Sequence, residues 1–382
     1  MAAEDPSAAA CAPSPEEITE WDQRIYAQLV STDLTAEQRD RITHPHHAYP
    51  RQDAVLAVHW HPECIPLDLV RRRIDAMFPG RQDELIVPTQ HNVLMSYGDF
   101  CGVEVDCYSA GFNRKVQLLV HAEARRVENA HVFRTMLAHT FKYRSHQLVE
   151  FMDTILRPSL EERLQEAAAH AGADARLVAF VRAWTGKLRR LMELNESITP
   201  PEAWKNKLLT YWFDELRAFH DDLLINHALV LLKAIKAVVK ANFSLEYFYG
   251  TSEVIEEVRG LGGCIVVPHP EQFWPILLAD YDVDGYEVWN PQSREYTEFL
   301  IHVVNRQNRE RSRKDRPILI LMGDDTHLGE KIRPPELQDP DKAGRQIGVQ
   351  PAWDDLAIRK SLIVANTDRR RVIEDYRARL RG

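Results

Sequence analysis

The stretch AVLAVHWH at 54–61 decides the fold, because five apolar residues run directly into two histidines. The same order recurs in CIVVPHP at 264–270 and in ILILMGDDTH at 318–327. A continuous apolar run of this length predicts a strand buried on both faces, as in a parallel sheet or barrel. In such folds the chemistry lies at the carboxyl ends of the strands. We therefore expect the polar residues after each run to meet at one edge of a sheet.

Three further runs end in the same kind of residue: ELIVP at 84–88 leads to His91, GVEVD occupies 102–106, and VQLLV at 116–120 delivers His121. Side chains two apart on a strand point to the same face, so a histidine pair such as His59 and His61 can hold one ion together. Mixed imidazole and carboxylate ligands favour Zn, Mn or Fe over Ca or Mg. The sequence thus predicts a transition-metal site. A further run, GYEVWN at 285–290, fits a strand but offers no evident ligand.

The order of these motifs resembles the pattern of the PHP (polymerase and histidinol phosphatase) superfamily. The resemblance covers residues 51–128 and 260–333 and rests on six motifs in the right order. Members of that family are distorted (β/α)7 barrels that hold up to three metal ions and mostly hydrolyse phosphoesters. The resemblance therefore implies an α/β fold, a TIM-like barrel of PHP type with a large helical insertion.

The resemblance also assigns roles to single residues. A first metal would be held by His59, His61, Glu104 and Asp325. Glu104 would bridge to a second metal held by His121 and His269, and His91 with His327 would hold a third. It further implies that Glu104, His269 and Asp325 carry the catalysis, with a metal-bridging hydroxide as the nucleophile.

One family position is not met. A further histidine usually follows the HxH pair by a few residues, and here Glu63, Cys64 or Asp68 would have to substitute for it. A dinuclear site therefore stays open beside a trinuclear one, and the expected cofactors are two to three divalent ions, Zn, Mn or Fe.

Several polar residues near the motifs have two readings. Asp106 is either a ligand, a partner of a ligand, or a structural loop carboxylate, whereas Asp324 is expected to orient its loop. Four basic residues could clamp a substrate anion or be solvated surface charge: Arg114, Lys115, Lys331 and Arg333. The cluster His44, His46 and His47 lies in a Pro-containing stretch with no apolar scaffold, so we expect loop residues there.

Composition bounds the remaining function classes. The chain has 382 residues, of which 45% are hydrophobic, and its net charge of -9 gives no basic footprint for general nucleic-acid binding. Its five cysteines form no CxxC pair, which favours reduced thiols in a cytoplasmic protein. No apolar stretch approaches the ~18 residues needed to span a bilayer. We expect a small-molecule phosphoester substrate and no association with a membrane. Nucleic-acid ends are a possible substrate, but the net charge does not indicate them.

The pattern of apolar residues changes at about residue 129, where helical spacing replaces the continuous strand-like runs. We expect five segments: an N-terminal extension with short helices at 1–50, the first barrel part at 51–128, a helical insertion at 129–259, the second barrel part at 260–346 and a C-terminal helical tail at 347–382. The insertion would be a lid over the metals, a docking element for a partner protein, or part of the core.

The predicted function is metal-dependent phosphoester hydrolysis. Two alternatives stay open: another metal-assisted hydrolysis, such as C–N cleavage on a related barrel, and a partner-binding regulatory protein whose metal site is structural.

Overall fold

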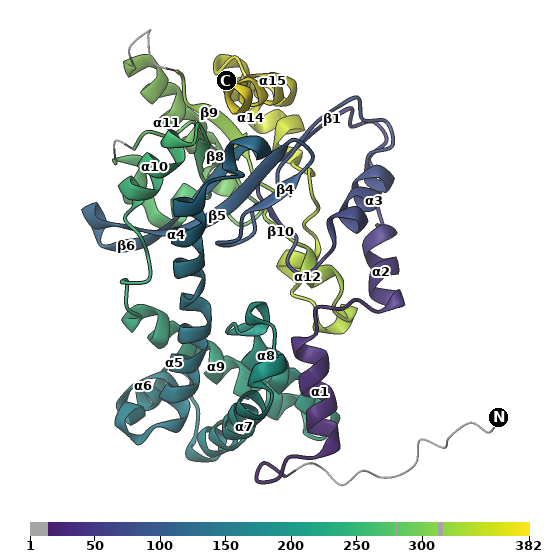
Figure 1. The fold of residues 1–382 in the computed structure, drawn as a ribbon, viewed down its shortest axis with the longest axis vertical. Coiled ribbons are helices and arrows are strands. Elements are labelled where there is room, and N and C mark those ends of the chain that lie inside the picture. The colour runs from purple at the N-terminus through teal and green to yellow at the C-terminus, as the bar shows by residue number, and fades with distance from the viewer. Residues whose placement is uncertain (1–13, 280, 312–315) are drawn as a thin grey trace, which may run out of the picture. The chain divides into compact units, whose positions relative to one another are not determined.

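The computed structural model describes residues 14–279, 281–311 and 316–382 and divides the chain into two compact units (Figure 1). The helical unit consists of 14–33 and 142–244, and the sheet unit of 34–141 and 245–382. The start of the predicted N-terminal extension, residues 1–13, lies outside the described residues. Within the part of the chain that is described, no helix is both long and apolar enough to cross a membrane.

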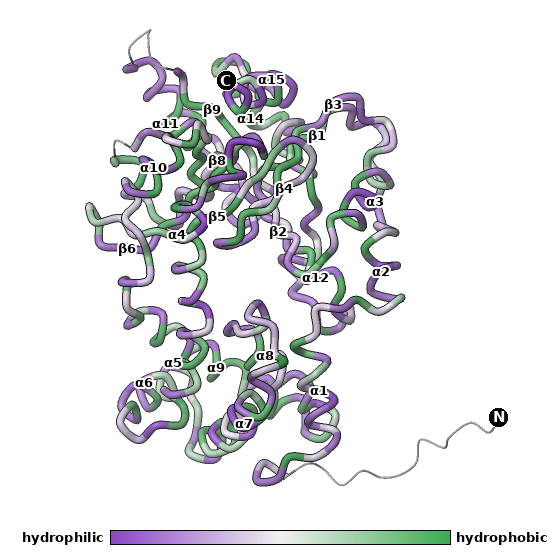
Figure 2. The backbone as a smooth tube through the Cα atoms, in the orientation of Figure 1, coloured by the Kyte–Doolittle hydropathy of each residue, from purple (hydrophilic) through white to green (hydrophobic). Residues whose placement is uncertain are grey.

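The helical unit is built of amphipathic helices around one apolar core. Its helices are α1 (Glu20–Val30), α5 (Tyr143–Leu156), α6 (Glu161–Ala171), α7 (Ala175–Leu194), α8 (Lys207–Glu215) and α9 (Asp222–Asn242). Asp174 and Asp221 accept hydrogen bonds from the first turns of α7 and α9 and so fix where these two long helices begin. Hydrophobic and hydrophilic residues alternate along α7 with helical spacing (Figure 2), and its buried face includes Trp184, Leu188 and Leu191.

The boundaries of this unit differ from the predicted insertion at 129–259. Helix α1 belongs to it, because the Lys187 ammonium on α7 lies 2.6 Å from the Asp22 carboxylate on α1. Helices α4 (His131–Phe141) and α10 (Thr251–Gly260) belong instead to the sheet unit, since Phe133 and Val254 join the core of the strands. Helical periodicity alone does not reveal which core a helix covers. The roles of this unit as a lid or docking element stay predictions.

The sheet unit holds all ten strands that the described residues form. They are β1 (Ala54–Ala57), β2 (Trp60–His61), β3 (Asp83–Ile86), β4 (Met95–Tyr97), β5 (Phe100–Ser109), β6 (Arg114–Glu123), β7 (Cys264–Val267), β8 (Gly285–Trp289), β9 (Leu319–Met322) and β10 (Thr326–His327). The strands β7, β8 and β9 are parallel, as the apolar runs predicted, whereas β4, β5, β6 and β7 pair antiparallel.

The strands form three ladders: β1 with β3, β2 with β10, and a six-stranded sheet in the order β4, β5, β6, β7, β8, β9. The predicted α/β class is confirmed, but no closed barrel is found among the described residues. Where β1 and β9 would have to pair, the Gln350 amide donates to Leu56 O at 2.9 Å and to Met322 O at 2.7 Å. A side chain thus replaces the backbone ladder there and satisfies both carbonyl groups.

Helices cover the strands of this unit. Helices α2 (Ala36–Thr43) and α3 (Leu67–Met77) pack on one face of β1 through Ile42, Val70 and Ile74, while Leu56 on the other face joins the large core of the sheet. β1 is therefore buried on both faces, as its composition predicted. The remaining helices are α11 (Thr297–Glu310), α12 (Leu328–Lys331), α13 (Pro340–Ala343), α14 (Leu356–Val364) and α15 (Arg369–Arg381).

Candidate metal centre

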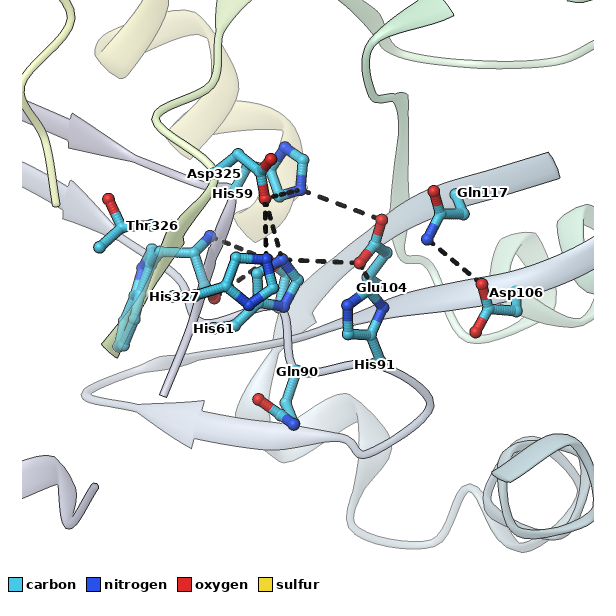
Figure 3. Close-up of polar contacts among 12 residues, drawn as sticks. His59, His61, Gln90, His91, Glu104, Asp106, Gln117, Asp325, Thr326 and His327 are labelled. Carbon is cyan, nitrogen blue, oxygen red and sulfur yellow. Dashed lines mark hydrogen bonds and ion pairs between the residues drawn. The ribbon is translucent and has the colours of Figure 1, made fainter. Parts of the chain in front are cut away.

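Seven of the eight predicted ligands lie together in the sheet unit. Figure 3 labels all of these except His269. Three of them lie on strands: His61 on β2, Glu104 on β5 and His327 on β10. The other four follow strands: His59 follows β1, His91 follows β3, His269 follows β7 and Asp325 follows β9. His59, His61 and Glu104 are each 1% exposed. The residues that follow the parallel strands therefore meet at one edge, as the carboxyl-end rule predicts.

Glu104 lies between two sets of histidines. Its Oε1 is 4.0 Å from His59 Nε2 and 3.8 Å from His269 Nε2. Its Oε2 is 3.6 Å from His61 Nε2 and 2.6 Å from His91 Nδ1. Because the two oxygens face different histidines, this carboxylate has the geometry of a bridge between two ions.

Asp325 faces the same histidines from the other side. Its Oδ1 lies 3.6 Å from His59 Nε2, 3.4 Å from His61 Nε2 and 3.4 Å from His327 Nε2. Its Oδ2 accepts hydrogen bonds from Gln292 Nε2 and Arg345 Nη1. One oxygen is thus free to bind an ion while the other is fixed by the protein.

The spacing of these atoms fits a metal better than a hydrogen-bond network. Most of the separations, 3.4 to 4.0 Å, are too long for hydrogen bonds. Ligand atoms that lie ~2.0–2.1 Å from one tetrahedral ion are roughly 3.4 Å apart. His59 Nε2 and His61 Nε2 are buried and have no hydrogen-bond partner. Such atoms are costly to bury unless a ligand satisfies them, so the residues present fit a divalent ion.

Three overlapping groups could each hold an ion: His61, His91 and His327; His59, Glu104 and His269; and His59, His61 and Asp325. In each group the candidate ligand atoms lie within 4.8 Å of one another. The third group shares His61 with the first and His59 with the second. Glu104 contacts residues of all three groups. The arrangement can therefore bring more than one ion into one buried volume.

Burial and the neighbouring charges shift the protonation of the centre. Burial disfavours the charged form of His59, but Glu287, Asp325 and Glu104 raise its pKa to about 10. Burial together with His327 and His91 lowers the pKa of His61 to about 3. Although burial opposes it, the histidines hold the pKa of Glu104 well below its usual range. At neutral pH the metal-free centre thus already has its ionised carboxylate, and a metal would displace a proton from His59.

His121 is not brought into the centre. Its Nδ1 is 2.6 Å from Tyr376 Oη and its Nε2 is 2.9 Å from Val58 O, so both ring nitrogens are occupied. The physical reason is strand direction: β6 runs antiparallel to β7, and His121 pairs with Cys264 at the amino end of β7. The carboxyl end of β6 therefore lies at the opposite edge of the sheet from His269.

The alternatives for the missing histidine are narrowed by geometry. Glu63, Cys64 and Asp68 belong to none of the three groups, but Glu63 Oε1 lies 3.6 Å from His327 Nδ1, a member of the first. Asp106 is fully buried and accepts hydrogen bonds from Asn92 and Gln117, and it pairs with Lys115 at 2.6 Å. It therefore anchors the residue next to His91 and faces no ion.

The remaining polar residues singled out in the sequence make local contacts or are exposed. Asp324 accepts from Thr326 N and Gly348 N, which agrees with its predicted role in orienting the loop. Lys331 is buried and donates to Ala343 O, and Arg333 lies 3.5 Å from Glu330. The loop histidines His44, His46 and His47 are exposed.

Sequence reasoning missed the residues behind the ligands. Glu287 on β8 lies 2.7 Å from His59 Nδ1, and Arg345 contacts Asp325 at 2.7 Å. The signal for Glu287 was present, because a carboxylate inside the apolar run GYEVW is rarely buried without a partner. Arg345 and Gln292 lie in loops with no periodic pattern, and nothing in the sequence marks them.

Neither a protein-family model nor a curated protein matches this chain. Two solved chains do match it in structure, among them a protein from Bifidobacterium adolescentis provisionally assigned as a metal-dependent phosphoesterase. It is 15% identical, the alignment covers 82% of this chain and 97% of that chain, and the TM-score is 0.42. A likeness at this level assigns neither fold nor activity to this chain.

Proposed function

We propose that the chain is a metal-dependent phosphoesterase of PHP type with a centre of two or three divalent ions. The observation that carries the proposal is the position of Glu104, whose two oxygens face different histidines. The proposed ligands are the seven residues that lie together: His59, His61, His91, Glu104, His269, Asp325 and His327. His121 is left out, because both of its nitrogens are hydrogen-bonded elsewhere.

When bound, neighbouring divalent ions lower the pKa of water and neutralise the charge of a phosphoryl group. The protein supplies the arrangement for this chemistry. Glu104 and Asp325 would both hold the ions, and Asp325 has one oxygen for this role because Arg345 and Gln292 hold the other. His59 directs Nε2 into the centre, since Nδ1 donates to Glu287. Glu104 and Asp325 thereby supply the negative charge that retains the ions.

The burial of the ligands also bears on the alternatives. A structural ion needs a closed set of about four ligands, whereas a catalytic ion keeps an open position. Seven ligand residues in three overlapping groups exceed what one structural ion requires. His91 and His327 keep side-chain exposures of 21% and 15%, so the His61, His91 and His327 group is the side that solvent reaches. We therefore favour catalysis over a purely structural site.

The test combines metal content with a substrate screen on the full chain. Elemental analysis of protein purified without added metal is expected to give two or three transition-metal ions per chain. The protein reconstituted with Mn or Zn should then hydrolyse phosphomonoesters or phosphodiesters and leave amide substrates intact. Less than one ion per chain after reconstitution would refute the metal centre, and turnover of amides alone would favour C–N cleavage.

A further inference from the structure

Two of the proposed ligands have a strained backbone. Asp325 has φ 44 and His269 has φ 28, and neither is a glycine. A residue other than glycine rarely adopts such a conformation and keeps it only where the surroundings over-determine it. The contacts of these two residues with their neighbours must therefore maintain the conformation of the centre.

His269 is held by Glu287. The backbone N–H of His269 donates to Glu287 Oε2 at 2.8 Å, and the other oxygen of the same carboxylate accepts from His59 Nδ1 at 2.7 Å. Glu287 is 2% exposed, and the Asn290 amide also donates to its Oε2. One buried carboxylate thus fixes the backbone of one ligand and the ring orientation of another.

The neighbouring strand leaves room for this carboxylate. A Cβ at Gly323 would lie 1.4 Å from Glu287 Oε1, so any other residue there would displace this carboxylate. Gly323 immediately precedes the DDTH motif that supplies Asp325. The position of Glu287 and the start of that loop therefore depend on each other.

Asp325 is held by Arg345. One nitrogen, Nη1, donates to Asp325 Oδ2 at 2.7 Å and to the backbone carbonyl of the same residue at 3.2 Å. The Arg345 side chain is 5% exposed, and Gln292 donates to the same Oδ2. Arg345 therefore restrains both the backbone and the carboxylate of Asp325.

We propose that Glu287 and Arg345 are positioning residues, which hold His59, His269 and Asp325 in the conformation that binds metal. This inference deepens the proposed function and rests on its metal centre. It predicts a division within the centre. Glu287 touches two members of the group His59, Glu104 and His269, whereas the group His61, His91 and His327 contacts neither positioning residue directly.

The experiment measures Zn²⁺ binding to the metal-free full chain by competition with a chromophoric chelator. Glu287→Gln keeps the size of the side chain but places an amide N–H against a donor, either His59 Nδ1 or the pair formed by His269 N and the Asn290 amide. Arg345→Lys keeps the charge but loses the planar guanidinium group and its fixed N–H donors. Each variant is expected to bind at least one ion about 10–100-fold more weakly while another ion keeps wild-type affinity, as for other partners of metal ligands.

The matched controls are a carboxylate and an arginine whose hydrogen bonds and ion pairs go to residues other than the proposed ligands. Glu330 is 2% exposed and accepts from Asp339 N, and Arg259 pairs with Asp282 and Asp284 before the start of β8. Glu330→Gln and Arg259→Lys should keep wild-type Zn²⁺ affinity at every site, even where they lower the melting temperature of the metal-free protein.

Wild-type affinity at every site in both Glu287→Gln and Arg345→Lys would overturn the positioning role and leave the metal centre intact. A wild-type chain that binds less than one ion would instead refute the proposed function itself. If the two variants fail to fold, Gln292→Ala decides, because it removes a single donor to Asp325. Weaker Zn²⁺ binding at an unchanged melting temperature supports the inference, and unchanged binding overturns it.

Discussion

Both units bury ionisable side chains, but they do so in opposite ways. In the helical unit Lys187 and Asp22 are fully buried, and their charged groups lie 2.6 Å apart, with a further hydrogen bond from Lys187 to Ser14 O at 2.8 Å. In the sheet unit several histidines surround two carboxylates, and the inward nitrogens of His59 and His61 have no hydrogen-bond partner. A buried charge that has a close opposite charge is structural, and buried groups that converge without partners indicate an absent ligand.

The sharpest way to break this comparison is to remove the bridging charge. Glu104→Gln changes little volume, but it removes the negative charge that both histidine sets face. We expect turnover to fall to the background of the metal-free protein, together with loss of bound metal, as measured by elemental analysis and phosphoesterase assay. His46→Ala and His131→Ala are the controls, because both side chains are exposed and lie outside the three groups. Equal loss in the controls would contradict the assignment of the centre.

The second prediction concerns the helical unit. Lys187→Met leaves Asp22 as a buried charge without its partner and should destabilise this unit by roughly 3–5 kcal/mol. Urea unfolding followed by circular dichroism measures the effect, and Zn²⁺ content should stay at the wild-type value. The double variant Asp22→Asn with Lys187→Met should recover part of the loss. A Lys187→Met chain that loses metal without losing stability would show that this pair is more than structural.

The smallest effect separates His121 from the ligands. Burial lowers the pKa of His121 to about 3 from an ordinary 6.5, so the folded chain binds fewer protons than the unfolded one between these values. Stability should therefore fall as pH drops below 6.5, by about 1.4 kcal/mol for each pH unit from this group. His121→Gln should remove that part of the slope in the metal-free protein and keep the Zn²⁺ content. An unchanged slope, or loss of metal, would return His121 to the ligand set.

His121 also shows how far the sequence predicts the centre. An apolar run followed by a polar residue is a good signal for a buried strand and a polar end, and seven of the residues it marked lie together in the structure. The same signal carries no information about strand direction, and β6 runs antiparallel to β7. The rule that chemistry lies at carboxyl ends holds for strands that run in the same direction as β7, so it failed for His121 on β6.

For the fold, too, the sequence predicted the single strands and helices but not the contacts between distant residues. Apolar runs gave β1, β7 and β9, and helical spacing gave the helices of the helical unit. Two results depend on contacts between distant residues and so leave no local pattern. One is the side-chain bridge from Gln350 to Leu56 and Met322 in place of a ladder, and the other is the membership of α1 in the helical unit through Lys187.

Helix α15 has a consequence for how the sheet unit forms. It packs against β1, β3, β6 and β9, which belong to different ladders, and its Tyr376 bonds to His121 across 255 positions of sequence. Contacts at such separations require closure of very long loops before they stabilise anything, which makes folding slow. The strands synthesised first, including the one that leads to His59, therefore have an incomplete core until α15 with Tyr376 has been synthesised and has packed against them. We expect this unit to rely on chaperones during that interval, because its apolar strands stay uncovered.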